Sequence, residues 1–320
     1  MSLPILHHYP ESPFSEKIRR VLAFKQLPWR SVHIPRIAPK PALTALTGGY
    51  RRTPVLQLGA DVYCDTALIC DVLEHLRPAP SLYPEPEKGV ARILAQWADS
   101  TLFWAAMSWN LQPASAARMF AGAPAGAARA FAEDRAKMGA GNITRPRPED
   151  AAAAYRSYLR RLSDMLDDRP FLLGEVPCIA DFAAYHPLWY TRERASSVAG
   201  ILDIVPAVSE WLDRIAALPD APSEPMAAEE AIAVAAEAAP LPHGEELFQD
   251  DHGIPLGSPV TVAAESFGTE PTAGELVAAT RMHITLRRTD PRAGTLHVHF
   301  PRIGYVLRRA DGAPEGGAGG

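Results

Sequence analysis

Short apolar runs alternate with a helical stripe of apolar residues at the start of the chain. Three runs have the length and composition of strands and cover residues 4–8, 29–34 and 53–58. A turn at Gly59 leads into a further short strand at residues 62–63. Between the first two runs, apolar residues recur at the spacing of one helix face, which predicts a helix over residues 16–25: Phe14, Ile18, Val21 and Leu22.

A second helical stripe follows the hairpin and ends at two prolines. Its inward positions are Ile69, Val72, Leu73 and Leu76, and Pro78 stops the helix because proline cannot continue it. The order of elements is strand, helix, strand, hairpin, helix, which is the thioredoxin-like order. We therefore expect an α/β domain over residues 1–79.

From about residue 85 the pattern is purely helical. One long helix is predicted from the stripe Val90, Ile93, Leu94, Trp97 and Trp104. Later stripes predict helices around residues 155–166, 179–190 and 209–218, the second of them broken or bent near Pro187. We expect an all-helical domain over residues 85–239, closed by an alanine-rich segment at residues 226–239.

A connector at residues 113–150 interrupts the helical part. It is rich in alanine, glycine and proline, and only its middle, residues 126–138, has the composition of a helix. Connectors of this length usually form a lid or a mobile surface loop, so we expect one of these here.

The pattern changes again near residue 240. Apolar and polar residues alternate over residues 280–286 and 295–300, with a turn at residues 290–294, which predicts a half-buried hairpin. Residues 305–309 predict one more strand. We expect a small β-rich module over residues 240–310, followed by a low-complexity, disordered tail at residues 311–320.

Composition narrows the possible functions. The net charge is −5 and the pI about 6.1, so bulk electrostatics favours neither nucleic acid nor an anionic membrane as a partner. No apolar run has the length of a membrane span, and the N-terminus lacks the pattern of a signal peptide. The three cysteines, Cys64, Cys70 and Cys178, form no C-x-x-C pair, which favours a reducing, cytoplasmic location.

Four short motifs resemble one enzyme family. They begin at Ser12 (SPFSEKIR), Arg52 (RTPVL), Cys64 (CDTALI) and Phe171 (FLLG, then CIADF after three residues). Their order and spacing are similar to those of the cytosolic glutathione S-transferases, especially the serine-type enzymes of plants and bacteria. The resemblance covers about residues 1–220. It departs from the family pattern at Cys178, where a hydroxyl residue usually caps a helix, and in the long connector.

The resemblance implies a glutathione site with separate groups for the two ends and the middle of the tripeptide. The glutamyl end would meet Asp65 and Thr66 at a helix start, where free N–H groups and the helix dipole favour a carboxylate. The cysteinyl backbone would pair with Val55 beside a cis Pro54, and the family pattern adds Phe14 and Thr53. Lys40 and Arg52 are candidates for the glycyl carboxylate, although such residues are often simply solvated. Asp65 or Thr66 can also be a plain helix cap.

Ser12 is the predicted catalytic residue. In the enzymes that this chain resembles, the residue here donates a hydrogen bond to the glutathione sulfur. The alternative is that Ser12 only caps the helix. Ser15 lies closer to the predicted helix start and is the more natural cap, which would leave Ser12 free.

Two further groups of residues carry weaker predictions. Phe103, Trp104, Met107 and Tyr190 can line an acceptor pocket between the two domains, or they can be ordinary helix packing. Three histidines on the C-terminal hairpin, His283, His297 and His299, invite a zinc interpretation. A polar sheet face explains these histidines without a metal, and we expect none.

We expect a glutathione S-transferase that activates the thiol of glutathione through Ser12 and conjugates it to a small-molecule electrophile. A related peroxidase activity would use the same thiolate. The alternative is a non-catalytic glutathione-binding or interaction protein in which the β module recognises a partner. Family resemblance also implies a homodimer and no metal cofactor.

Overall fold

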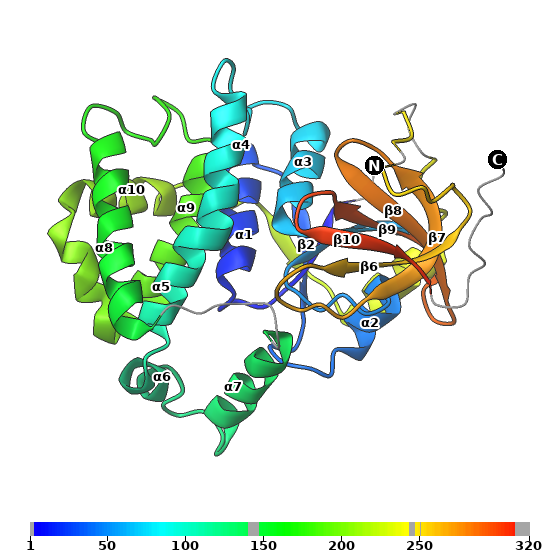
Figure 1. The fold of residues 1–320 in the computed structure, drawn as a ribbon, viewed down its shortest axis with the longest axis horizontal. Helices are drawn as coiled ribbons and strands as arrows, with labels where there is room; N and C mark the ends of the chain where they lie inside the picture. Colours follow the sequence, from blue (N-terminus) through cyan, green and yellow to red (C-terminus); the bar gives the residue numbers. More distant parts are fainter. Residues whose placement is uncertain (1–2, 140–146, 243–246, 250, 311–320) are drawn as a thin grey trace.

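The computed structural model describes residues 3–139, 147–242, 247–249 and 251–310, and contains a ten-stranded sheet with helices beside it (Figure 1). The strand order is β10-β6-β7-β8-β9-β4-β3-β1-β2-β5, so the two ends of the described chain contribute to one sheet. The predicted tail at residues 311–320 lies outside the described residues.

The N-terminal part has the predicted thioredoxin-like order. Strand β1 pairs with β2 in parallel and with β3 in antiparallel orientation, and β3 pairs with β4. The helix α2 was not predicted from the sequence. The elements are β1 (Ile5–His8), α1 (Pro13–Lys25), β2 (Trp29–His33), α2 (Pro41–Thr47), β3 (Val55–Leu58), β4 (Asp61–Cys64) and α3 (Thr66–Leu76).

The helical part contains the predicted helices and, in the connector, α6 as well as α7. The π-helical turn η1 joins α4 to α5, and a second such turn, η2, follows α9, which runs through Pro187 to Trp189. The elements are α4 (Lys88–Trp97), η1 (Ala98–Leu102), α5 (Phe103–Asn110), α6 (Pro113–Met119), α7 (Ala127–Met138), α8 (Pro148–Met165), α9 (Ile179–Trp189), η2 (Tyr190–Arg194), the 3₁₀ helix η3 (Ser196–Ile204) and α10 (Pro206–Ala216).

The buried side of α4 differs from the predicted one. Val90 and Ile93 are 57% and 71% exposed, whereas Ala91 and Ala95 are buried. The small alanine side chains face α9, which packs against α4, and small residues allow two helix backbones to approach closely. The apolar stripe located the helix correctly, but it did not identify the face that packs.

The start of α9 tolerates the unusual Cys178. Asp181 is fully buried, and its carboxylate accepts hydrogen bonds from the backbone N–H groups of Cys178 and Leu172 and from the indole of Trp211, each at 2.9 Å. These bonds fix the helix start without a hydroxyl cap, so the departure from the family pattern is compensated locally.

The β-rich C-terminal part continues the sheet of the N-terminal part. It consists of β6 (Pro259–Ala264), β7 (Thr272–Ala279), β8 (His283–Asp290), β9 (Gly294–Pro301) and β10 (Tyr305–Arg309). Strand β9 lies parallel to β4, with Asp61 opposite His297 and Tyr63 opposite His299. Figure 1 shows these strands, in orange and red, beside α2 and α3. The sequence predicted β8, β9 and β10, but not that they would join the sheet.

The sequence predicted that residues 226–239 close the helical part, and this prediction is wrong. The strand β5 (Ser223–Pro225) pairs with β2, and α11 (Ala228–Ala236) packs against α2, β2 and β9. The buried side chains of α11 join a hydrophobic cluster that contains Val55 and Val62 of the N-terminal strands and Leu286 and Val298 of the C-terminal ones. The strands of the C-terminal part therefore share a hydrophobic core with those of the N-terminal part.

Two histidines of the C-terminal hairpin, His297 and His299, are buried at the junction of β4 and β9, whereas His283 is partly exposed. His297 and His299 are each 8% exposed, and the Nε2 atom of His299 lies 2.9 Å from a carboxylate oxygen of Asp61, which is itself 1% exposed. The other carboxylate oxygen of Asp61 accepts the backbone N–H of Leu241 at 2.8 Å. The polar face predicted for this hairpin is therefore covered where these two histidines lie, and His299 satisfies a buried carboxylate.

We predict that Asp61→Ala destabilises the whole sheet, because it leaves His299 and the Leu241 N–H without their buried acceptor. The expected loss is about 2–6 kcal/mol in the free energy of unfolding, since each of the two buried donors left without an acceptor costs about 1–3 kcal/mol. Urea unfolding followed by circular dichroism measures it.

The control is Glu275→Ala, which breaks a half-exposed ion pair with Arg287 in the same part of the sheet. Such a pair contributes about 0–1 kcal/mol. Equal, small effects of both substitutions would contradict a stabilising role for Asp61.

Candidate glutathione site

Ser12 is the N-cap of α1, which begins at Pro13, so the prediction that Ser15 caps the helix is wrong. The hydroxyl oxygen of Ser12 accepts the backbone N–H of Ser15 at 3.2 Å, and Ser12 is 2% exposed. A hydroxyl has one proton to donate and two lone pairs. The cap uses one lone pair of Ser12 and leaves its proton available to an acceptor such as a thiolate.

The side chains of Asp65 and Thr66 lie at the start of α3, as predicted. Asp65 is the N-cap, and its Oδ1 accepts the N–H of Ala67 at 2.9 Å. The hydroxyl of Thr66 accepts a hydrogen bond of 3.1 Å from Nζ of Lys17 on α1. The capping role and the proposed binding role therefore use the same atoms, and Thr66 keeps its own proton.

Lys17 belongs to a buried charged network that the sequence analysis missed. Its ammonium lies 2.5 Å from Oδ2 of Asp99, and the ring of His186 bonds Oδ1 of Asp99 at 3.0 Å. Burial disfavours the charge on Lys17, but the charge and hydrogen bond of Asp99, together with other nearby groups, outweigh burial and raise the pKa of Lys17. Burial lowers the pKa of His186, so Lys17 is the cation that neutralises Asp99.

The residues around Pro54 are arranged partly as predicted. The Thr53–Pro54 peptide is cis, as expected. Val55 does not lie at an unpaired edge, because it is fully buried in the sheet opposite His7 of β1 and Cys64 of β4. The prediction that the cysteinyl backbone pairs with Val55 is therefore wrong. Thr53, which precedes the strand, is the nearby residue outside the paired ladder.

Lys40 points inward. Its ammonium donates to the hydroxyl of Thr53 at 3.0 Å, and only 7% of the residue is exposed. Burial, with the nearby charges of Arg135 and Arg51, lowers the pKa of Lys40 to about 8. Lys40 is thus a partly desolvated cation held beside Thr53, which suits a carboxylate ligand better than a solvated lysine does.

Arg52 is held by the C-terminal part of the chain. Its Nε donates to the carbonyl oxygen of Phe267, in the loop between β6 and β7. The ring of Phe267 packs edge to face on Trp104 of α5, with ring centroids 5.3 Å apart. The neighbouring Gly268 donates its N–H to the carbonyl of Met138 at 2.7 Å. This loop therefore bridges the N-terminal part, α5 and the end of α7.

The residues proposed for the acceptor pocket have packing roles. Phe14 contacts Phe103, with ring centroids 4.7 Å apart, and it contacts His186 at 4.5 Å. Met107 is 5% exposed, and Tyr190, at 8%, donates to the sulfur of Met119. Phe14, which was predicted to bind glutathione, and Phe103 of the predicted acceptor pocket join α1 to α5. Their contact with an acceptor remains a prediction.

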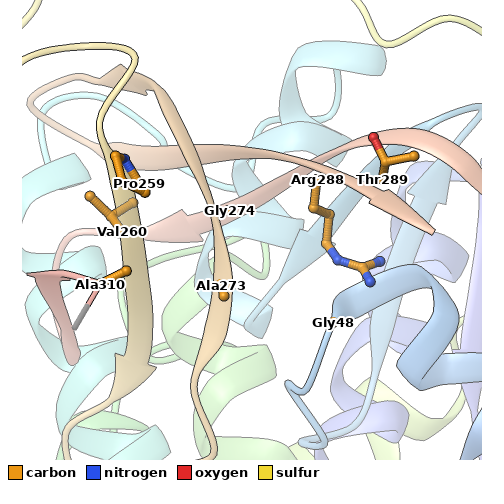
Figure 2. Close-up of a pocket in the computed structure, with 8 residues that line it drawn as sticks. All are labelled: Gly48, Pro259, Val260, Ala273, Gly274, Arg288, Thr289 and Ala310. Atoms are coloured by element: carbon orange, nitrogen blue, oxygen red, sulfur yellow. The ribbon is translucent and has the colours of Figure 1, made fainter. Parts of the chain in front are cut away.

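A hollow of about 450 Å³ lies elsewhere, on the C-terminal strands. Figure 2 shows Arg288 extending towards Gly48 at the end of α2, and Gly274 on the strand between those of Val260 and Arg288. Arg288 donates to the carbonyl oxygen of Ala45 at the C-terminal end of α2. The hollow contains none of the predicted glutathione-binding residues, and its arginine anchors α2.

Among the described residues, no group of three or more His, Cys, Asp or Glu side chains could hold a metal ion. No helix in the described part of the chain is long and apolar enough to cross a membrane.

Comparisons with known proteins identify the family. The family model of the glutathione S-transferase N-terminal domain matches residues 6–81, and that of the C-terminal domain matches residues 123–214. A GST-like protein of known structure from Pseudomonas syringae is 40% identical, with a TM-score of 0.82, and the alignment covers 97% of this chain and 100% of that one. The chain therefore belongs to the glutathione S-transferase family.

Two other relatives cover less of the chain. FtsZ-localized protein A of Caulobacter vibrioides is 25% identical over 184 residues, 56% of this chain and 73% of that protein. A glutathione S-transferase from Rhodospirillum rubrum is 22% identical with a TM-score of 0.51, over 67% of this chain and 88% of that one, which shows the fold alone. The Pseudomonas match is long enough to include the C-terminal strands, so that protein shares them.

Sequence reasoning missed Lys17, Phe267 and Tyr305 for different reasons. Lys17 has the same sequence signal as a solvated helix lysine. Phe267 and Tyr305 lie 215 and 240 positions from the residues they bond, Arg52 and Asp65, so no local pattern relates them.

We predict strong coupling between Lys17 and Asp99. Lys17→Met and Asp99→Leu should each cost about 3–5 kcal/mol, because each leaves one buried charge without its partner. The double variant should be more stable than either single variant, and chemical unfolding of the three proteins tests this.

The pH dependence of the wild type has a defined sign. The pKa of Asp99 is lowered in the fold, where the Lys17 charge and the His186 bond outweigh burial, so its contribution to stability is lost as the pH falls through that low pKa.

The control for the Lys17 and Asp99 substitutions is Arg129→Ala, in the exposed pair with Glu133, which should change stability by under about 0.5 kcal/mol. Additive effects of the two buried substitutions would exclude the coupling.

Proposed function

We propose that this protein binds glutathione, stabilises its thiolate through Ser12 and transfers it to a small-molecule electrophile. The supporting observation is the geometry of Ser12. Its oxygen caps α1 and its proton is left for an acceptor, at a helix start whose dipole favours an anion. The family match supports the transferase scaffold, and the thiol activation is our proposal.

The energetic requirement is modest. A free thiol has a pKa of about 8.5, and lowering it by about two units requires roughly 2.7 kcal/mol of preferential thiolate stabilisation. One hydroxyl donated to an anion contributes about 1.5–3 kcal/mol. The N-terminus of α1 adds about 0.3–1 kcal/mol. No cation beside the sulfur is needed for catalysis at neutral pH.

The two ends of glutathione have matching groups. We assign the glutamyl ammonium to Asp65 and the glutamyl carboxylate to Thr66, whose oxygen is engaged by Lys17 so that its proton faces a ligand. Thr53, beside the cis Pro54, takes over the backbone role first assigned to Val55. Lys40 is the cation for the glycyl carboxylate, whereas Arg52, whose Nη1 lies 3.8 Å from Oδ2 of Asp65, belongs to the glutamyl end. Phe103 with Trp104 marks the acceptor side.

A second candidate is a non-catalytic role as an interaction protein. The observation that favours it is the match to FtsZ-localized protein A, whose name describes a location with FtsZ and no reaction. Under this alternative the protein would bind glutathione, or only its partner, without conjugating an aryl halide or reducing a peroxide.

A homodimer is also proposed from the family, and the exposed apolar side chains of Val90 and Ile93 on α4 support it.

We predict that Ser12→Ala raises the pKa of the bound thiol by about one to two units, since it removes one charge-assisted hydrogen bond. Conjugation of an aryl halide should fall about tenfold to a hundredfold, with little change in glutathione affinity. Ultraviolet titration of the bound thiolate measures the pKa directly.

Ser15→Ala is the matched control, because the hydroxyl of Ser15 is buried one helical turn from Ser12 and lacks a hydrogen-bond partner. It should leave the titration unchanged. Identical curves for wild type and Ser12→Ala would reduce Ser12 to a helix cap, and a shift in Ser15→Ala instead would transfer the role to Ser15.

We predict that binding of S-methylglutathione weakens as the pH rises through about 8, the pKa of Lys40. Protonated Lys40 attracts the glycyl carboxylate and neutral Lys40 does not, and the methylated thiol cannot titrate. Lys40→Met should bind weakly with a flat profile between pH 7 and 8.5, roughly one unit around that pKa. Lys88→Met, an exposed lysine of α4, should keep the wild-type profile. The same slope in Lys40→Met would assign the titration to another group.

A further inference from the structure

The last strand of the sheet places a tyrosine on the carboxylate of Asp65. The hydroxyl of Tyr305, the first residue of β10, donates to Oδ2 of Asp65 at 3.0 Å. The same oxygen lies 3.8 Å from Nη1 of Arg52, while Oδ1 accepts the N–H of Ala67. Three separate segments of the chain therefore orient one carboxylate, and the C-terminal strand supplies one of them.

Tyr305 is fixed in place. The residue is 8% exposed and pairs with Ala264 of β6 at the start of the antiparallel β10–β6 ladder. Its ring packs against Phe300, with centroids 5.6 Å apart, and its hydroxyl lies 3.3 Å from that of Tyr50. Displacing this side chain would disturb a core cluster and a strand end, so Tyr305 is held rigidly beside Asp65 and cannot easily move away when a ligand binds.

Asp65 remains able to take a ligand. A carboxylate offers about four lone-pair positions, and the hydrogen bonds from Ala67 and Tyr305 occupy one on each oxygen. The side chain is 25% exposed, in contrast to the buried Tyr305. Asp65 has a φ of +77°, a conformation that non-glycine residues adopt at a cost and that is kept where surrounding contacts impose it.

We propose that Tyr305 is a positioning residue of the glutathione site, which holds the Asp65 carboxylate in the orientation that receives the ammonium group of the γ-glutamyl moiety. The inference rests on the proposed function, since it assumes that glutathione binds at Asp65. It also assigns a role to the C-terminal strands: they complete the site for one end of the ligand.

The test uses Tyr305→Phe in the full chain and two ligands that differ in one group. Glutathione carries the ammonium, and glutaryl-cysteinylglycine replaces it with hydrogen. We expect the substitution to weaken glutathione about tenfold, the effect of one charge-assisted hydrogen bond, as measured by calorimetry. Binding of the deamino ligand should be the same in variant and wild type, which a general loss of structure would not produce.

Two controls complete the design. Tyr155→Phe also removes one buried hydroxyl contact, to Thr191 at 2.8 Å in the helical part, and should leave both affinities unchanged. In an Asp65→Ala background, Tyr305→Phe should have no further effect on glutathione binding, because it acts through that carboxylate.

The outcomes separate the two proposals. Failure of the wild type to bind glutathione overturns the proposed function itself. If the wild type binds glutathione and Tyr305→Phe binds it equally well, the positioning role is overturned. Tighter binding by Tyr305→Phe also overturns it, because the hydroxyl would then compete with the ammonium for Asp65. Equal weakening of both ligands, or an undiminished effect in the Asp65→Ala background, also overturns it.

Discussion

The parallel pairing of β9 with β4 is the interaction on which the rest of the structure depends. Without it, β4 would be the edge strand of the N-terminal sheet and would leave backbone groups unpaired. With it, one sheet extends from β5 to β10, and its two halves share a hydrophobic cluster. The pairing buries Asp61, so His299 and the Leu241 N–H must satisfy that carboxylate. The strands beyond β9 curve back, so that Tyr305 at the start of β10 contacts Asp65, which follows β4.

Polar groups around the candidate site are paired in advance by the chain itself. Thr66 accepts from Lys17, Thr53 accepts from Lys40, and Asp65 accepts from Tyr305. A buried polar group without a partner is costly, so such pairing lets the groups stay desolvated and oriented before a ligand arrives. Ligand binding then uses the remaining protons and lone pairs, which lowers the ordering cost of binding.

The C-terminal strands are more than an addition to a standard scaffold. Their β6–β7 loop holds Arg52 through Phe267 and contacts α5 and α7, while β10 contributes Tyr305. The connector that the sequence suggested as a lid also takes part, because Asp134 of α7 pairs with Arg51. The surroundings of Arg51, Arg52 and Asp65 are thus built from segments far apart in the sequence.

The sequence by itself determined the local elements and the family. Helical and alternating apolar patterns located α1, α3, α7, β9 and β10, and the Ser12, Pro54 and Asp65 motifs carried the family resemblance, because these depend on neighbours along the chain. Tertiary structure alone decided which face of α4 is buried, that α11 packs against the sheet and that Val55 lies in an interior strand. It also decided that Lys17, Phe267 and Tyr305 meet the site residues. Those outcomes depend on strand pairing and on the compensation of buried charge between distant segments, and no local spacing encodes either of them.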